Sequence, residues 1–382
     1  MSRSQAILSD LIAFDTVSRT PNAALMAYAT NLLEAAGAQI TKIPFEEGRE
    51  SLYAVIGPAD RPAVVLSGHT DVVPVTGQAW TKPPFALTRE AGRLYGRGTA
   101  DMKGFCAAAI AAAERAGSRD LKTPLAIALS CDEEVGCLGV RPLIDLLAQM
   151  PFRPALVIIG EPTGLAVATG HKGKTALKAT FGGRESHSAL APLGLNALHL
   201  AADFIVALRE RQAEIEGSGG RDGDYDVPFT TIHAGKLAGG VALNIVPNRA
   251  ELDFEIRALA EDNMDEIIGQ LEGDAARIVA ATGDEDAVIE IKRDFAYPGL
   301  STDKASEAVD FVKRLTGANG TIKVAYGTEG GLFAEGLGVP AVVCGPGSMA
   351  QGHRPDEFIT EDDLARCDGM LDALIERLEG GV

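Results

Sequence analysis

The chain has 382 residues, enough for two or three domains of about 100–200 residues each. Its 46% hydrophobic and 23% charged residues are typical of a folded globular protein and exclude a disordered chain. The net charge of −18 argues against binding to nucleic acid or an anionic membrane, which require clustered Lys and Arg. The excess of carboxylates could instead bind metal ions or a cationic substrate, or could simply keep the protein soluble.

The N-terminus and the cysteines indicate where the protein works. MSRSQAILSDLIAFDTVSRT lacks a basic stretch followed by a long apolar one, so we expect no signal peptide. No apolar run reaches the ~20 residues of a membrane span, and we expect a cytoplasmic protein. Five cysteines form no disulfide framework. Cys131 and Cys137 lack CxxC spacing and are predicted to be small buried residues rather than zinc ligands.

Short apolar segments alternate with helical ones over the first 160 residues. Residues 63–71, 124–134 and 155–162 are apolar and bounded by polar or turn residues, as are strands that are buried on both faces of a sheet. An Ala-rich helix is predicted over 104–115 and another helix over 140–150. This alternation predicts a layered α/β domain.

Each of these three predicted strands ends in polar residues: HTD, DEE and GEP. Ligands of open α/β sheets bind at the carboxyl ends of the strands, so we expect these residues to converge on a site. With the GRGTADMKG turn and a later histidine, the candidate ligands are His69, Asp71, Asp101, Glu133, Glu134, Glu161 and His353. Imidazoles and carboxylates suit zinc, manganese or cobalt, and one carboxylate can bridge two ions. The alternative for any one of them is a turn, a cap or a solvated loop.

Local spacing separates the roles within this set. Asp71 lies two residues after His69, so on a strand both side chains point the same way and the carboxylate can orient the imidazole. Glu133 and Glu134 are adjacent and project differently. One of them can therefore bind metal while the other faces the metal-activated water.

The pattern changes after residue 172. Residues 173–183, 249–259 and 286–294 alternate apolar and polar side chains, as half-exposed antiparallel strands do, and helices are predicted over 194–213 and 262–281. The order strand–helix–strand–strand–helix–strand predicts a two-layer α+β unit.

The first pattern returns near residue 292. We therefore predict a discontinuous catalytic domain, residues 1–172 and 292–382, interrupted by an inserted domain over 173–291. The Gly- and Asp-rich segment 214–226 is predicted to be a loop inside the insert.

Several motifs together resemble the M20 family of metallo-aminoacylases and carboxypeptidases. They are SGHTDVVP (67–74), GRGTADMKG (96–104), SCDEEVG (130–136), IIGEPT (158–163) and SHSA (186–189), and the resemblance runs over essentially the whole chain. It implies a mixed-sheet three-layer α/β/α catalytic domain with an inserted two-layer, ferredoxin-like dimerisation domain. It further implies a homodimer that acts on a small N-acyl amino acid.

The resemblance also implies a role for each candidate ligand. His69, Asp101 and Glu161 resemble the ligands of one zinc ion, and Asp101 bridges to a second ion that Glu134 and His353 complete. Co²⁺ and Mn²⁺ are the expected substitutes for zinc.

The remaining site residues are also implied by the resemblance. Glu133 resembles the general base and Asp71 the partner of His69. His187, in the insert, matches the histidine that reaches the site of the partner subunit and stabilises the oxyanion; a surface turn is its alternative. Asn244 and Arg257 match positions that contact the substrate.

Two segments bear on the substrate. GTEGG (327–331) and GPGSMAQGHRPDEFI (345–359) are most similar to family members that convert N2-acetylornithine to ornithine and acetate in arginine biosynthesis. Glu329 would then face the cationic δ-amine and Arg257 the α-carboxylate. Three alternatives stay open: a succinyl-diaminopimelate desuccinylase, a general N-acyl-amino-acid deacylase, and an inactive member that only binds an amino acid.

Overall fold

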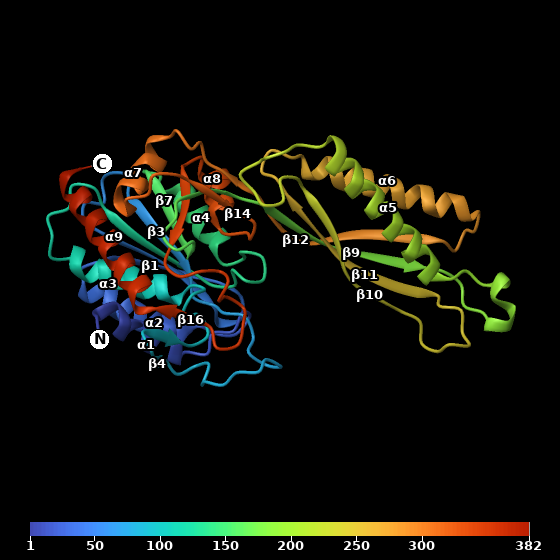
Figure 1. Ribbon diagram of the computed structural model, residues 1–382, viewed down its shortest axis with the longest axis horizontal. Helices are drawn as coiled ribbons and strands as arrows, with labels where there is room; N and C mark the ends of the chain where they lie inside the picture. Colours follow the sequence, from blue (N-terminus) through green and yellow to red (C-terminus); the bar gives the residue numbers. More distant parts are fainter. Residues whose placement is uncertain (382) are drawn as a thin grey trace. The chain divides into compact units, whose positions relative to one another are not determined.

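The computed structural model describes residues 1–381 and divides the chain into two compact units (Figure 1). The first unit comprises Met1–Gly170, Leu300–Val324 and the chain from Thr328 onward. The second comprises His171–Gly299 with Ala325–Gly327. The second unit is thus an insertion between two parts of the first.

A mixed nine-stranded sheet forms the centre of the first unit. Its strands, in spatial order, are β1 (Gln39–Pro44), β2 (Glu50–Ile56), β6 (Leu125–Ser130), β3 (Val64–His69), β7 (Leu156–Pro162), β15 (Ala341–Gly345), β8 (Ala168–His171) and β13 (Leu300–Ser301), with β14 (Ile322–Val324) paired to β8. The neighbours β6, β3, β7 and β15 run parallel, and the pairs β1–β2 and β2–β6 are antiparallel. The predicted buried strands therefore form the middle of the sheet.

Helices cover both faces of this sheet. One hydrophobic core joins the sheet to α1 (Arg3–Ala13), α2 (Ala23–Ala35), α3 (Lys103–Ala116), α7 (Glu307–Thr316) and α9 (Glu361–Gly380). On the other side, α4 (Val140–Gln149) and α8 (Gly330–Leu337) pack against each other and against strands (Figure 1). The predicted three-layer α/β/α architecture is confirmed. Within residues 1–381, no helix combines the length and the apolar character needed to cross a bilayer.

Small residues bring α3 close to the strands that carry the candidate site. A side chain added at Gly160 on β7 would overlap the ring of Phe105 on α3. One added at Gly68 on β3 would lie 2.9 Å from the sulfur of Cys106, whose thiol donates to the carbonyl of His69 at 3.2 Å. The Ala-rich helix therefore packs directly beneath the ends of these strands.

A separate three-stranded sheet ties the C-terminal segment to the middle of the chain. It consists of β4 (Thr88–Glu90), β5 (Arg93–Tyr95) and β16 (Phe358–Thr360), in the order β16–β5–β4. Because β16 pairs with β5, the segment that follows His353 lies beside the turn that contains Asp101.

The second unit is a four-stranded antiparallel sheet with two helices. Its elements are β9 (Gly173–Gly182), the short 3₁₀ helix η2 (Ser188–Leu193), α5 (Ala197–Ser218), β10 (Thr231–Gly239), β11 (Arg249–Ala258), α6 (Met264–Thr282) and β12 (Val288–Tyr297). The strand order is β10–β11–β9–β12, and the core contains Phe181, Phe204 and Phe254. The predicted two-layer α+β unit is confirmed.

Three details of this unit differ from the predictions. Strand β10 has its place in the predicted order but was given no residue range, because TIHAGKLAG contains two glycines and no sustained alternation. Helix α5 continues to Ser218, so the first part of the predicted loop 214–226 is helical. The predicted boundary after residue 291 falls inside β12, which pairs with β9 along its length.

Candidate metal centre

The carboxyl ends of the central strands bring the candidate ligands together. His69 is the last residue of β3, Glu161 lies near the end of the neighbouring strand β7, and Glu133 and Glu134 follow β6. Ligand atoms of His69, Glu133 and Glu161 lie within 4.8 Å of one another, as do those of His69, Asp101 and Glu134. Parallel strands end at the same edge, which is why residues distant in sequence meet here.

The carboxylate of Asp101 lies between two histidines. Its Oδ1 is 3.1 Å from Nε2 of His69, and its Oδ2 is 3.1 Å from Nε2 of His353. A glutamate accompanies each histidine: Glu161 lies 3.6 Å from His69, and Glu134 lies 3.0 Å from His353. The five side chains therefore form two groups that share one aspartate.

Burial and crowding raise the pKa values of both glutamates and both imidazoles in this cluster. Burial, with the nearby charge of Asp101, raises the pKa of Glu161 well above its ordinary value and that of Glu134 to about 7. Hydrogen bonds to Asp101 and Glu134 raise the pKa of His353 to about 10. Burial opposes a charged His69, yet its carboxylate neighbours hold its pKa well above the usual value. The raised pKa values of all four groups reflect an excess of buried negative charge.

The residues present fit a divalent cation. Oε2 of Glu161 is buried and has no hydrogen-bond partner among residues 1–381. Within residues 1–381, the cationic side chains that form ion pairs with Asp101, Glu134 and Glu161 are His69 and His353. Imidazole nitrogen and carboxylate oxygen are ligands that zinc, cobalt and manganese accept. A cation would partner the orphaned oxygen and neutralise the crowded carboxylates.

Asp71 supports two members of this cluster. Nδ1 of His69 lies 3.0 Å from the carbonyl oxygen of Asp71 and 3.6 Å from its carboxylate, which leaves Nε2 facing Asp101. The carboxylate of Asp71 also accepts the backbone N–H of Glu133 at 3.0 Å and the hydroxyl of Ser18 at 2.7 Å. One aspartate thus orients the imidazole and anchors the segment after β6.

Three contacts in that segment were not predicted from the sequence. Asp132, which has a φ of 53°, forms a buried ion pair with Arg49 and accepts the N–H of Arg19. The thiol of Cys137 donates to Oε1 of Glu133 at 3.2 Å. Cys137 is buried, as predicted. Its closeness to Glu133 in the sequence was a signal from which their contact could have been predicted. The pairing of Arg49 with Asp132 had no such signal, because the two residues are 83 positions apart.

Glu329 lies in the interior of the first unit. It is 1% exposed, and its two carboxylate oxygens accept the hydroxyl protons of Ser67 on β3 and Ser130 on β6. In this conformation the carboxylate links two strands that lead to the metal ligands. The predicted contact between Glu329 and a substrate amine stays a prediction, and this burial does not favour it.

Three predicted site residues belong to the second unit. His187 is exposed, and its Nδ1 accepts the N–H of Ala189 at 3.1 Å, so a neutral ring carries its proton on Nε2. The guanidinium of Arg257 contacts Glu255 at 3.0 Å and the hydroxyl of Tyr297 at 3.3 Å. The side chain of Asn244 lies on the surface.

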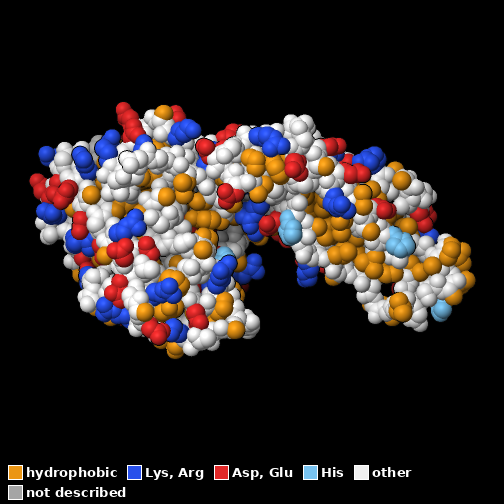
Figure 2. Space-filling view, in the orientation of Figure 1, with side chains coloured by type: hydrophobic (Ala, Val, Ile, Leu, Met, Phe, Trp, Pro, Cys, Tyr) orange, Lys and Arg blue, Asp and Glu red, His pale blue; other side chains and the backbone are white. Residues whose placement is uncertain are grey.

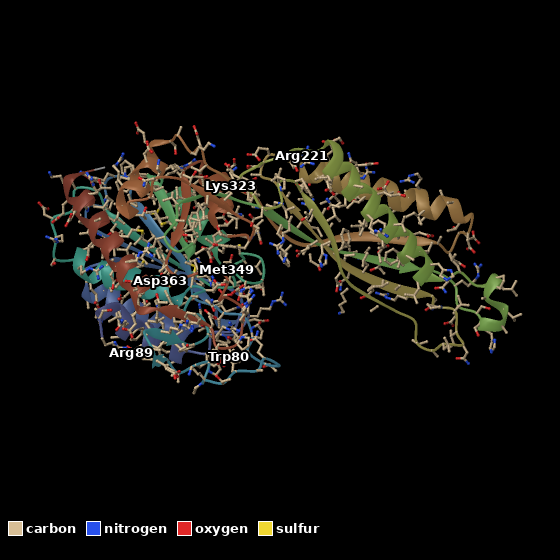
Figure 3. All side chains as sticks on the ribbon, in the orientation of Figure 1. Trp80, Arg89, Arg221, Lys323, Met349 and Asp363 are labelled. Atoms are coloured by element: carbon tan, nitrogen blue, oxygen red, sulfur yellow. The ribbon has the colours of Figure 1, made fainter. Side chains whose placement is uncertain are left out.

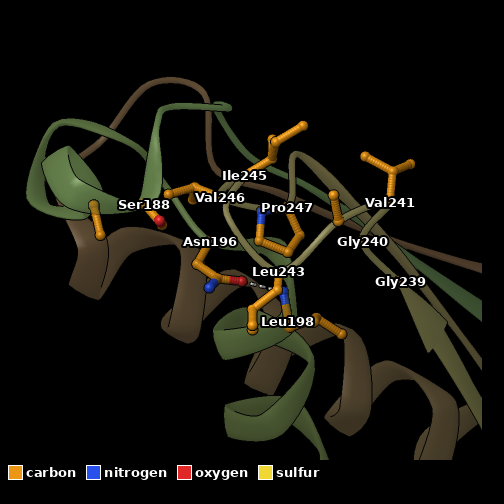
Figure 4. Close-up of a pocket in the computed structure, with 12 residues that line it drawn as sticks. Ser188, Asn196, Leu198, Gly239, Gly240, Val241, Leu243, Ile245, Val246 and Pro247 are labelled. Carbon is orange, nitrogen blue, oxygen red and sulfur yellow. Dashed lines mark hydrogen bonds between the residues drawn. The ribbon is translucent and has the colours of Figure 1, made fainter.

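The surface around Asn244 is apolar. Residues 240–243 and 245–247, in the loop between β10 and β11, line a pocket of about 510 Å³ together with Ser188, Asn196 and Leu198 (Figure 4). Val241 and Leu243 in this loop are 88% and 101% exposed. On the face shown in Figure 2, hydrophobic side chains gather over the second unit.

Comparison with known proteins places the chain in a family. It matches the model of peptidase family M20/M25/M40 over residues 65–377. It is 34% identical to the acetylornithine deacetylase of Myxococcus xanthus, with 99% of this chain and 98% of that protein covered.

Solved structures share the fold. The M20 family metallo-carboxypeptidase Sso-CP2 of Sulfolobus solfataricus has a TM-score of 0.78 at 20% identity, covering 99% of this chain and 100% of that one. The YXEP protein of Bacillus subtilis, a dinuclear metal-binding peptidase of the M20 family, has a TM-score of 0.71 at 16% identity, covering 100% of this chain and 98% of that one. Because the family model matches most of the chain and the Myxococcus xanthus relative aligns with nearly all of it, this chain belongs to peptidase family M20/M25/M40.

Proposed function

We propose that this protein is a two-metal amidohydrolase that releases ornithine and acetate from N2-acetylornithine, a reaction of arginine biosynthesis. The observation that carries the proposal is the position of Asp101, whose two oxygens face two histidines that each have a glutamate beside them. The name of the Myxococcus xanthus relative supports the substrate. A cytoplasmic location is part of the proposal.

The proposed ligands divide between two zinc ions. His69, Asp101 and Glu161 would hold one ion, and Asp101, Glu134 and His353 the other, with Co²⁺ or Mn²⁺ as substitutes. When bound, such ions polarise an amide carbonyl and lower the pKa of water toward ~7. Asp71 would keep the imidazole of His69 turned toward its ion, as its contacts with Nδ1 allow.

Glu133 is the proposed general base. Burial raises the pKa of this carboxyl well above its ordinary value, and Cys137 donates a hydrogen bond to it. A base with a raised pKa can take the proton of the attacking water and then deliver it to the leaving amine. The proton thus moves from water to product through one side chain.

Residues of the second unit would complete the reaction. With its proton on Nε2, His187 can donate to the oxyanion that forms when water attacks the carbonyl. Arg257 would bind the α-carboxylate of the substrate in exchange for part of its contact with Glu255, and Asn244 would add a hydrogen bond. We assign no substrate contact to Glu329 in this proposal.

A homodimer through the second unit is also part of the proposal. Strand β10 lies at the edge of its sheet, and an unpaired edge can add a strand from a second copy. The exposed apolar loop 240–247 adds surface that a partner would cover. In such a dimer His187 would serve the site of the partner subunit.

The test is amine release by zinc-loaded protein from acetyl-, succinyl- and formyl-amino acids, with a chelator control. We expect N2-acetylornithine to give the highest kcat/KM and chelation to abolish turnover. Preference for succinyl-diaminopimelate would make the protein a desuccinylase, and equal rates on neutral acetyl-amino acids would make it a general deacylase. Turnover that survives metal removal would contradict the proposal.

Glu133→Gln tests the base separately. We expect kcat to fall by at least about 10²–10⁴-fold, because the amide cannot accept the proton of water. Zinc content by elemental analysis should stay at the wild-type level. Glu335→Gln, an exposed glutamate on α8, is the matched control and should keep wild-type activity. Substantial activity in Glu133→Gln would remove this residue from the mechanism.

A further inference from the structure

Glu357 is a buried carboxylate that binds the backbone of the turn carrying Asp101. It is 1% exposed, and its Oε2 accepts hydrogen bonds from Nη1 of Arg97 at 2.6 Å and from the backbone N–H of Gly98 at 3.1 Å. Its Oε1 accepts the N–H groups of Ala100 at 2.9 Å and Asp101 at 3.1 Å. Three backbone donors of one turn therefore converge on a single side chain.

The partner of this carboxylate reaches the other side of the metal centre. Arg97 is 1% exposed, and its guanidinium donates to the carbonyl of Arg354 at 3.3 Å and to the side-chain oxygen of Gln78. The amide of Gln78 in turn donates to the carbonyl of His353 at 2.9 Å. Two consecutive carbonyls, those of His353 and Arg354, are thus held from the same ion pair, the first of them through Gln78.

The only tryptophan of the chain belongs to this network. The guanidinium of Arg97 lies 5.0 Å from the centre of the Trp80 ring, and Nε1 of Trp80 donates to Gln78 at 3.0 Å. Figure 3 labels Trp80 in the first unit. Its fluorescence therefore reports on the environment of Arg97 and Gln78 without interference from another indole.

We propose that the Arg97–Glu357 pair is a positioning device that sets the spacing between Asp101 and His353, so that both reach the same metal ion. The inference rests on the proposed function, because it assigns these two residues to one ion. His353 is exposed and has a φ of 61°, and its imidazole contacts Asp101 and Glu134, the proposed ligands of the same ion. The position of its backbone therefore determines whether the imidazole can reach that ion together with Asp101. A metal ion needs its ligands at set distances, and charge-assisted hydrogen bonds in a buried network supply that rigidity.

A purely stabilising role explains the arrangement less well. A buried ion pair is seldom more stable than well-packed apolar residues of the same volume. Apolar residues could neither accept the three N–H groups near Asp101 nor donate to the carbonyls near His353. What the pair adds is a fixed link between two segments 260 residues apart in the sequence.

Glu357→Gln is the informative substitution. The amide keeps the size of the side chain, but its NH₂ group faces donors that need an acceptor. We expect affinity for the more weakly held Zn²⁺, measured by chelator competition, to fall about 10–100-fold, the usual effect of losing a group that supports a metal ligand. The absorption spectrum of the Co²⁺-loaded variant should change, and kcat should fall more than KM rises.

Trp80 supplies a readout that is independent of activity. In the wild type, adding Zn²⁺ to metal-free protein should change the tryptophan emission, because ordering of His353 is transmitted through Gln78 to the indole. In Glu357→Gln the change should be lost or require more Zn²⁺. Asp274→Asn, which removes a buried carboxylate paired with Arg211 in the second unit, is the control and should leave Zn²⁺ affinity unchanged.

Gln78→Leu provides a second variant in case Glu357→Gln does not fold. It removes the link to His353 at a half-buried position and should weaken Zn²⁺ binding in the same direction, by less. Wild-type protein that binds no Zn²⁺ would overturn the proposed function and this inference with it. A wild type that binds Zn²⁺, with wild-type affinity and cobalt spectrum in both variants, would overturn the positioning role alone.

Discussion

At the scale of single residues, the candidate site depends on glycines as much as on its ligands. Gly160 on β7 precedes Glu161 and leaves room for the ring of Phe105 on α3. Gly345 on β15 would overlap the carbonyl oxygen of Gly160 if it carried a side chain. These absent side chains let the helix and two strands approach closely enough to bury Glu161.

Gly160→Ala should therefore destabilise the protein. Overpacking of this kind costs about 1–3 kcal/mol of unfolding free energy, because Phe105 has to shift. Gly273→Ala is the matched control: this exposed residue of α6 has open space around it, and alanine should stabilise the helix by about 0.5–1 kcal/mol. Urea unfolding of both variants measures the two effects. Equal stability of the two would contradict the packing argument.

At the scale of elements, a buried lysine joins α3 to the end of α1. Nζ of Lys103 donates to the carbonyls of Leu11 at 3.1 Å and Phe14 at 2.8 Å, at the C-terminal end of α1. Burial lowers the pKa of Lys103 to about 8. Between pH 8 and 10.5, Lys103 is therefore mostly deprotonated in the folded protein, whereas the unfolded chain, with a pKa near 10.5, still binds the proton.

This shift predicts a pH dependence of stability. Because the unfolded chain binds the extra proton between pH 8 and 10.5, the free energy of unfolding should gain up to about 3 kcal/mol from Lys103 as the pH rises through that window. Below pH 8 the contribution is absent. Urea unfolding of metal-free wild type and Lys103→Met across these pH values isolates it. A difference between the two proteins that does not vary with pH would show that Lys103 titrates normally.

At the scale of the whole molecule, the second unit exposes a sheet edge, apolar side chains and a histidine that a second copy of the chain could contact. Its edge strand β10 is exposed from His233 to Gly239, and Leu243 is fully exposed beside it. The imidazole of His187 has a donor Nε2–H and lies on the surface. A second copy would cover the apolar side chains and give His187 a site to serve.

Mixing two inactive variants tests this arrangement. Glu133→Gln and His187→Ala should each be nearly inactive as homodimers, for different reasons. A mixed dimer has one complete site, with Glu133 from one subunit and His187 from the other, so an equal mixture should recover about a quarter of wild-type activity. Differently tagged subunits verify that mixed dimers form. Verified mixed dimers without activity, or a fully active monomer, would contradict the dimer proposal.

The periodicity of the sequence was sufficient for much of the fold. Three apolar segments ending in HTD, DEE and GEP predicted buried strands with polar carboxyl ends, because hydrophobic patterning within one strand is local. In the structure these strands run parallel. The alternation in β9 and β11 similarly predicted an antiparallel sheet with one covered face. Strand β10, with its two glycines, carried no such signal.

Only the tertiary structure decided which side chains meet. The sequence by itself determined the layered fold and the set of residues that could bind metal. Patterning and spacing did not place Asp101 between His69 and His353, which only the family resemblance implied. Nothing in the sequence indicated the burial of Glu329 against Ser67 and Ser130 or the pairing of Arg97 with Glu357. The physical reason is distance along the chain: patterning reports which face of an element is buried, whereas contacts between distant segments depend on how whole elements pack.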